Sequence, residues 1–222
     1  MSKLIWDKTG ERFYETGVQK GVLYTKTGDN AEWKGVAWNG LTAVTESPSG
    51  AEATPLYADD IKYLNLMSAE EFGGTIEAYT YPDEFKPCLG EIDAVAGMTI
   101  GQQARKTFGF CYRTAVGNDE LGTNYGYKLH IVYNALASVS ERAYSTINDS
   151  PEAITFSWEF STTPETITVN GESKFTALVT IDSKKVKEAN LKELEDKLYG
   201  TDGEDATLPT PDEIFGILNK TA

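Results

Sequence analysis

The sequence is short of the side chains on which most enzyme and metal sites depend. Among its 222 residues there is one histidine, His130, and there are two cysteines, Cys88 and Cys111. A site with several histidine ligands is therefore excluded, and so is a histidine-centred triad in a natural setting, because His130 lies in mid-strand between apolar neighbours. The cysteines have no metal-ligand spacing, and we expect free thiols, although the sequence also permits one disulfide between them.

Motifs for catalysis or cofactor binding are also missing. The sequence contains no phosphate-binding P-loop, no dinucleotide fingerprint and no HExxH zinc motif. The acidic pair Asp59 and Asp60 and the acidic stretch 202–205 lack the ligand spacing of a calcium loop, so solvated loops are the better interpretation. Nothing selects any two carboxylates for glycoside hydrolysis. We therefore expect a protein that is not an enzyme and that needs no metal or cofactor.

Long apolar runs and basic residues are scarce as well. No stretch approaches the roughly 18 apolar residues of a membrane span, and the first residues do not read as a signal peptide, so we expect a soluble, cytoplasmic product. Lys and Arg number 20 against 34 Asp and Glu, which gives a formal net charge of -14. Such a charge disfavours a protein that holds nucleic acid by neutralising phosphates. It is equally compatible with a simple role in solubility.

Apolar side chains recur at every second position along most of the chain, which is the pattern of β-strands. The pattern is clearest at 151–163, where Trp158 and Phe160 fall on one face and Glu159 falls on the other. Further strands are predicted at 21–25, 36–44, 61–67, 75–81, 107–116, 127–136 and 174–181. The length and the 40% apolar content fit one domain, residues 1–222. The predicted fold class is mainly β, a sandwich or barrel.

The two ends of the chain contain the remaining predicted features. Residues 1–34 form an N-terminal arm and the first strand, and Trp6 docks either on another molecule or back on its own domain. An apolar stripe predicts one helix at 183–199, which Gly200 ends. Residues 200–222 form a tail whose apolar patch, with Ile214 and Phe215, needs cover from its own body or from a neighbour.

One internal segment does not fit a simple strand or turn. Residues 46–61 are too many for a hairpin turn and too poor in large apolar groups for a core, so we predict a long loop. The strand predicted to follow it, 61–67, is apolar on both faces. Such a strand is covered on both sides, within a sandwich or within an assembly.

Long runs of the sequence resemble the major tail protein of bacteriophages with long, non-contractile tails that infect Gram-positive hosts. They include GVAWNGLTAVTESPSGAEATPLYADDIKYLNL and YKLHIVYNALASVSERAYSTINDSPEAITFSWEFSTTP, and they cover nearly the whole chain in collinear order. The resemblance implies a tail-tube β-sandwich or barrel with a flanking C-terminal helix and long loops. It implies a structural virion protein whose hexameric rings stack into the tail tube through which genome DNA enters the host.

The same resemblance implies partners and a location. The partners would be further copies of the chain, a tape measure protein, a tail terminator and baseplate or initiator proteins, with DNA passing without specific binding. The protein would be assembled in the host cytoplasm and end in the virion tail. Two other classes stay open: an acidic β-sandwich whose Trp and Tyr side chains bind a carbohydrate or a host receptor, and, last in rank, a hydrolase.

Candidate site residues follow from the predicted tube. A wall that lets DNA pass should present carboxylates and small hydroxyls and few cations. The predicted lumen residues are Thr75, Glu77, Ser157, Glu159 and Ser161. Alternatively, Glu159 is an ordinary solvent-facing residue of a one-sided sheet. The predicted contacts between subunits or rings are Trp6, Ser47, Pro48, Ser49, Gly50, Glu52, Tyr57, Asp59, Asp60, Asp119, Glu120, Ile214 and Phe215.

Overall fold

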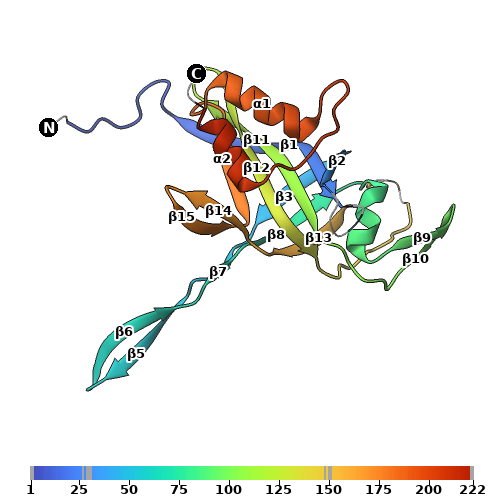
Figure 1. The fold of residues 1–222 in the computed structure, drawn as a ribbon, viewed down its shortest axis with the longest axis horizontal. Helices are drawn as coiled ribbons and strands as arrows, with labels where there is room; N and C mark the ends of the chain where they lie inside the picture. Colours follow the sequence, from blue (N-terminus) through green and yellow to red (C-terminus); the bar gives the residue numbers. More distant parts are fainter. Residues whose placement is uncertain (1–2, 27, 29–31, 148, 150–151, 221–222) are drawn as a thin grey trace.

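A curled antiparallel β-sheet forms the body of the protein, with helices against one side and hairpins that project from it (Figure 1). The computed structural model describes residues 3–26, 28, 32–147, 149 and 152–220. The predicted class, mainly β, is confirmed. Parts of the predicted N-terminal arm, 1–34, and of the predicted tail, 200–222, lie outside the described residues.

Eight strands form the main sheet, in the order β2-β1-β11-β12-β13-β8-β3, with β16 also paired to β12. They are β1 (Phe13–Thr25), β2 (Lys34–Trp38), β3 (Leu41–Glu46), β8 (Gly73–Ala78), β11 (Phe108–Asn118), β12 (Gly122–Ala137), β13 (Phe156–Thr162) and β16 (Leu178–Asp182). The sheet curls until β3 approaches β1, where the Leu41 side chain lies against Gly21 and leaves no room for a Cβ there. The result is a barrel-like sandwich.

Two-stranded hairpins account for the other strands. They pair β4 (Ser49–Gly50) with β7 (Glu70–Glu71), β5 (Ala53–Ala58) with β6 (Ile61–Met67), β9 (Ile92–Val95) with β10 (Met98–Ile100), and β14 (Glu165–Val169) with β15 (Glu172–Thr176). The predicted strand 174–181 is thus two strands that separate at Ala177 and pair with different partners. Phe175, in the first of these strands, is 73% exposed.

The concave side of the sheet encloses an aromatic core. Inward positions alternate along each strand, as predicted for 107–116 and 151–163, and a short 3-10 helix, η1 (Asp83–Leu89), adds Phe85 to them. The Phe85 ring centroid lies 4.6 Å from that of Trp38 and 5.3 Å from that of Trp158. The Trp38 indole donates a hydrogen bond to the Thr80 carbonyl over 2.9 Å, so its one polar group is satisfied.

A second core lies on the convex side, beneath helices α1 (Glu188–Tyr199) and α2 (Pro211–Leu218). Leu191, Leu194 and Leu198 form the buried stripe of α1 at helical spacing. The end of β1, from residue 21 on, and much of β11 and β12 are therefore buried on both faces. The cysteines lie in different cores, Cys88 in the first and Cys111 in the second, and both are free, so the disulfide alternative is wrong.

The helical predictions need two corrections. The helix predicted at 183–199 begins at Glu188, because the preceding residues form a turn after β16, and it ends at Gly200 as predicted. The predicted tail contains a second helix, α2. It begins with a reciprocal capping box between Thr210 and Glu213, followed by Pro211 at the first helical position.

The prediction of a long loop at 46–61 is wrong. Residues 47–72 form one long hairpin, which we call the arm, built from β4 and β5 on one side and β6 and β7 on the other. Asp59 and Asp60 form its two-residue turn, with φ angles of 51° and 61°. Two successive left-handed residues define the turn type that best continues the twist of a hairpin, and Asp tolerates that conformation. Figure 1 shows the arm projecting away from the body.

Candidate interaction surfaces

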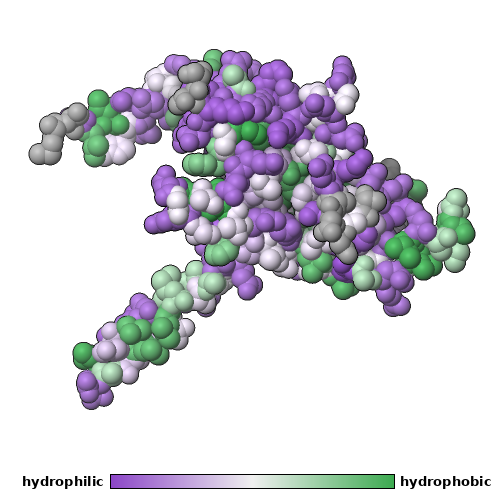
Figure 2. Space-filling model, viewed as in Figure 1, coloured by the Kyte–Doolittle hydropathy of each residue, from purple (hydrophilic) through white to green (hydrophobic). Residues whose placement is uncertain are grey.

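The arm exposes apolar side chains on both of its faces. Every residue of β5 and β6 is exposed, and Tyr57, Tyr63 and Met67 are 70%, 69% and 69% exposed. Hydrophobic residues are visible along its length in Figure 2. A two-stranded hairpin without a covered face is marginally stable in water at best. The arm is therefore a candidate surface for contact with another molecule.

A bulge in the pairing of β5 with β6 gives the arm one aliphatic face and one mixed face. Cross-strand partners share a face, and the register pairs Leu56 with Leu64 and Ala58 with Ile61. The register shift between Leu56 and Tyr57 thus places Ile61 beside Leu64, where strict alternation would have separated them. The aliphatic face consists of Leu56, Ile61, Leu64 and Leu66. The mixed face contains Tyr57 and Met67.

A polar cluster holds the base of the arm at the mouth of the barrel. The Tyr112 hydroxyl donates to Glu46 Oε1 over 2.6 Å, and His130 Nδ1 lies 3.2 Å from the same oxygen. The His130 ring stacks on Tyr112 at 4.6 Å between centroids, and its Nε2 is 3.0 Å from Thr114 Oγ1. Burial lowers the pKa of His130, although the Glu46 carboxylate acts in the opposite direction. His130 is thus a neutral structural residue at pH 7, as its setting in the sequence predicts.

The predicted lumen residues come together on the outward face of two neighbouring strands. In the pairing of β8 with β13, Thr75 lies opposite Glu159, and Glu77 lies opposite Ser157. Ser161 follows on the same face of β13, opposite Gly73. The residues between them, such as Ile76 and Trp158, point into the aromatic core. The patch presents carboxylates and hydroxyls and contains no cation among these five residues.

The predicted contact residues separate into four groups. All eight that lie in the arm are exposed: Ser47, Pro48, Ser49, Gly50, Glu52, Tyr57, Asp59 and Asp60. Trp6 is 75% exposed and Phe215 is 38% exposed. Glu120 is exposed, but Asp119 beside it accepts hydrogen bonds from the Gly10 and Arg12 amides at 3.1 and 3.4 Å, which hold the N-terminal segment. Ile214, at 2% exposed, is buried in its own helical core, so no neighbour can reach it.

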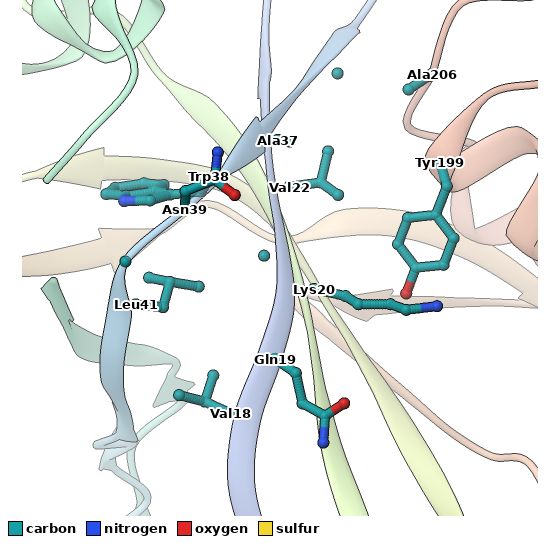
Figure 3. Close-up of a pocket in the computed structure, with 13 residues that line it drawn as sticks. Val18, Gln19, Lys20, Val22, Ala37, Trp38, Asn39, Leu41, Tyr199 and Ala206 are labelled. Atoms are coloured by element: carbon teal, nitrogen blue, oxygen red, sulfur yellow. The ribbon is translucent and has the colours of Figure 1, made fainter.

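Two features went unnoticed in the sequence. One is the β9–β10 hairpin, whose Val95 and Met98 are 63% and 55% exposed within a stretch for which no strand is predicted. The other is a groove of about 670 Å³ where β1, β2 and the turn into β3 meet the end of α1 (Figure 3). The groove includes Lys20 and Tyr199. The only local sign of it is Gly21, a residue that commonly marks a bulge or a close backbone approach in a strand.

The groove is formed by an irregularity in β1. The register of β1 against β11 shifts between Gln19 and Val22, and Lys20 there has a φ of 51°. Lys20 Nζ lies 5.3 Å from the centroid of the Tyr199 ring, and both side chains are seen together in Figure 3. The Tyr199 hydroxyl oxygen is buried and has no hydrogen-bond partner among the described residues. Burial raises the pKa of Tyr199, so this hydroxyl remains protonated.

Groups of catalytic or metal-binding type are few among the described residues. No cluster of three or more His, Cys, Asp or Glu side chains within them could hold a metal ion. Burial raises the pKa of Cys88 and of Cys111 to about 12, so neither thiol is a nucleophile at neutral pH. In the part of the chain that the structure covers, no helix is long and apolar enough to cross a membrane.

Comparisons with known proteins identify the family of the chain. No curated protein matches the chain significantly. One similar solved structure is described as "Cryo-EM structure of the anti-feeding prophage (AFP) baseplate, 6-fold symmetrised". Its sequence is 10% identical, and the match covers 82% of this chain and 97% of that chain with a TM-score of 0.33. This likeness is too distant to carry an argument. A family model described as "Phage tail tube protein" matches residues 11–203. Because that match spans most of the chain, the protein belongs to the phage tail tube protein family, and it is a structural component of the virion tail.

Proposed function

We propose that the protein forms hexameric rings that stack into the tail tube of a phage with a long, non-contractile tail. The observation that carries this proposal is the arm, a long apolar hairpin without a covered face in a chain of this family. The host type, a Gram-positive bacterium, is proposed from the sequence resemblance. Assembly takes place in the host cytoplasm, and the finished tube conducts genome DNA into the next cell.

In this assembly the arm contacts a neighbouring subunit or ring. Its two apolar faces are unfavourable in water, and both lose contact with water when the arm is inserted between copies. The polar cluster of Glu46, Tyr112 and His130 fixes the point from which the arm leaves the barrel. Trp6 and Phe215, both exposed, are further contact candidates near the two ends of the chain.

The polar face of β8 and β13 lines the lumen. Glu77 and Glu159 repel phosphates within the screening length of about 8 Å at physiological salt, and the neighbouring hydroxyls of Thr75, Ser157 and Ser161 bind no charge tightly. DNA therefore passes without being held. The net charge of -14 fits such a wall. Further partners are a tape measure protein inside the tube, a terminator at one end and a baseplate or initiator complex at the other.

Electron microscopy of the purified chain, with and without tail initiator proteins, tests the proposal. We expect tubes with sixfold rings. The matched control replaces residues 48–71 by a short glycine-rich turn, which the structure permits because Ser47 N donates to Gly73 O over 2.8 Å at the base of the arm. This variant should remain a folded monomer. A wild-type chain that stays monomeric at high concentration with initiators present would contradict ring assembly, and a reconstruction with Glu77 and Glu159 on the outer wall would contradict the lumen assignment.

A further inference from the structure

The groove beside Tyr199 has hydrogen-bond donors without a matching anion. Lys20 is its one charged residue, since the other lining residues are Val18, Gln19, Gly21, Val22, Gly35, Ala37, Trp38, Asn39, Gly40, Leu41, Tyr199 and Ala206. Lys20 makes no ion pair with any described residue, although the chain has 34 carboxylates in its sequence. The buried Tyr199 hydroxyl beside it has no acceptor within the described structure. A carboxylate would satisfy both groups.

The shape of the groove admits another chain. Its lining includes the small side chains of Ala37 and Ala206, which leave room for an approaching segment, whereas the spaces beside Gly21 and Gly35 are filled by Leu41 and Ala206 of the same chain. The outer edge of β2 also opens into it. Gly35 N donates to Ala206 O over 2.8 Å on that edge, and Ala37, two residues further, presents its own amide in the same direction. An open strand edge is a ready site for a second β-hairpin.

The conformation of Lys20 is costly and needs a reason. Its φ of 51° lies in the left-handed region, which a lysine rarely adopts, and such outliers gather at functional positions. The turn places the side chain beside the Tyr199 ring, where Lys20 stays exposed to solvent. The strain thus holds the cation at the mouth of the groove.

The tip of the arm carries the complementary charge. Asp59 and Asp60 form the turn, both are exposed, and neither has a hydrogen-bond or ion-pair partner among the described residues. Tyr57 and Ile61 flank them and are 70% and 65% exposed. The tip therefore combines two carboxylates with apolar side chains, and the groove combines a cation and a hydroxyl donor with an apolar lining.

We propose that the arm tip of one copy docks into this groove of a second copy, where the Asp59 and Asp60 carboxylates accept from Lys20 Nζ and the Tyr199 hydroxyl. The inference rests on the self-assembly proposed above and specifies its contact. The partner is a second copy because the arm projects away from its own body (Figure 1). Docking replaces water around the tip with a matched charge and gives the buried hydroxyl its acceptor.

Disulfide trapping between two variants tests the contact. Chains carrying K20C are mixed with chains carrying D60C, assembled with tail initiators and mildly oxidised. The native cysteines do not interfere, because both are buried and the pKa of each is raised to about 12. We expect intermolecular disulfides in the mixture and none in either variant alone. The matched control, K20C with E70C at the exposed base of the arm, should stay unlinked. Assembled tubes without the Lys20 to Asp60 link would overturn the docking site.

Charge reversal gives a second readout that does not depend on oxidation. K20E should raise the critical concentration for assembly about tenfold or more, because like charges across an interface are strongly unfavourable. The double variant D59K/D60K should do the same, and the triple variant should recover most of the loss. Y199F should weaken assembly and leave the melting temperature within a few degrees. If K20E assembles like the wild type, the docking site is wrong while the tube proposal stands; if the wild type forms no tubes with initiators, both fail.

Discussion

The aliphatic face of the arm should supply much of the free energy of assembly and almost none of the free energy of folding. We take the variant in which Leu56, Ile61, Leu64 and Leu66 are all replaced by threonine, which keeps a high strand propensity while removing most of the apolar surface. In the isolated chain these four side chains are 41%, 65%, 39% and 55% exposed. The surface that they still offer to a partner thus corresponds to about two fully exposed side chains.

That surface sets the expected magnitude. Fully burying a Leu or Ile side chain is worth about 1.5–3 kcal/mol, so covering this face contributes about 3–6 kcal/mol for each arm. Because every 1.4 kcal/mol is a factor of ten in an equilibrium constant, the critical concentration for tube formation should rise by about two to four orders of magnitude. The melting temperature should change little, since all four side chains are exposed in the isolated chain.

Pelleting of tubes across a dilution series measures the critical concentration, and circular dichroism on heating checks the fold. The matched control replaces Leu121 and Val139, exposed apolar residues outside the arm at 57% and 86%, by threonine, and should leave both quantities unchanged. A variant arm with the wild-type critical concentration and an intact fold would refute the reasoning. A large drop in melting temperature would instead show that the arm packs within its own chain.

Three further predictions concern the body. The His130→Asn variant should flatten the pH dependence of stability. Burial lowers the pKa of folded His130, so the unfolded chain binds a proton first, and the wild type should lose unfolding free energy as the pH falls below about 6.5, by about 1.4 kcal/mol for each unit of pKa difference. Urea titrations between pH 7.5 and 5 measure this loss, and an equal slope in the variant would contradict the prediction. Thiol titration at pH 8 should find Cys88 and Cys111 unreactive in the native protein and both reactive in denaturant, because the pKa of each is raised to about 12; fast native labelling would show that one is accessible. Ile214→Ala should lower the unfolding free energy by about 2–5 kcal/mol, as other truncations of buried aliphatic side chains do. Urea titrations measure this change, and a loss below about 1 kcal/mol would instead place the side chain at an interface.

The strands that the sequence predicts best are those whose burial lies within one chain. In β13, Trp158 and Phe160 alternate with Glu159 because one face enters the aromatic core and the other meets solvent. The arm differs, because neither face of its hairpin is buried in the monomer and Leu56 and Ile61 are both exposed. Its sequence therefore shows no alternation between buried apolar and exposed polar positions. Small residues and the Asp turn then made it resemble a loop. A hairpin whose faces are exposed in its own chain cannot be found by searching for a core.

The candidate sites were predictable only as far as local periodicity reaches. Alternation places Thr75 with Glu77 on one face of its strand and Ser157 with Glu159 on one face of another, but the pairing of those strands is set by contacts some eighty residues apart. The groove is harder still, because Lys20 and Tyr199 meet only after α1 has packed on the sheet. The α2 helix is a different case. Its capping box at Thr210 and Glu213 was visible in the sequence, but a two-turn apolar segment after it gave too short a pattern to recognise.

Charge explains why the contacts take the form that they do. A chain with a formal charge of -14 repels its own copies, and six of them in the ring proposed above would repel one another more strongly. Contacts between such copies cannot rely on scattered ion pairs, each of which contributes at most about 1 kcal/mol at the surface. In the proposed assembly, association comes from apolar burial of the arm, while the proposed contact of Lys20 with Asp59 and Asp60 selects the position at which the arm is buried. The same excess of acid then remains free to face the DNA in the proposed tube.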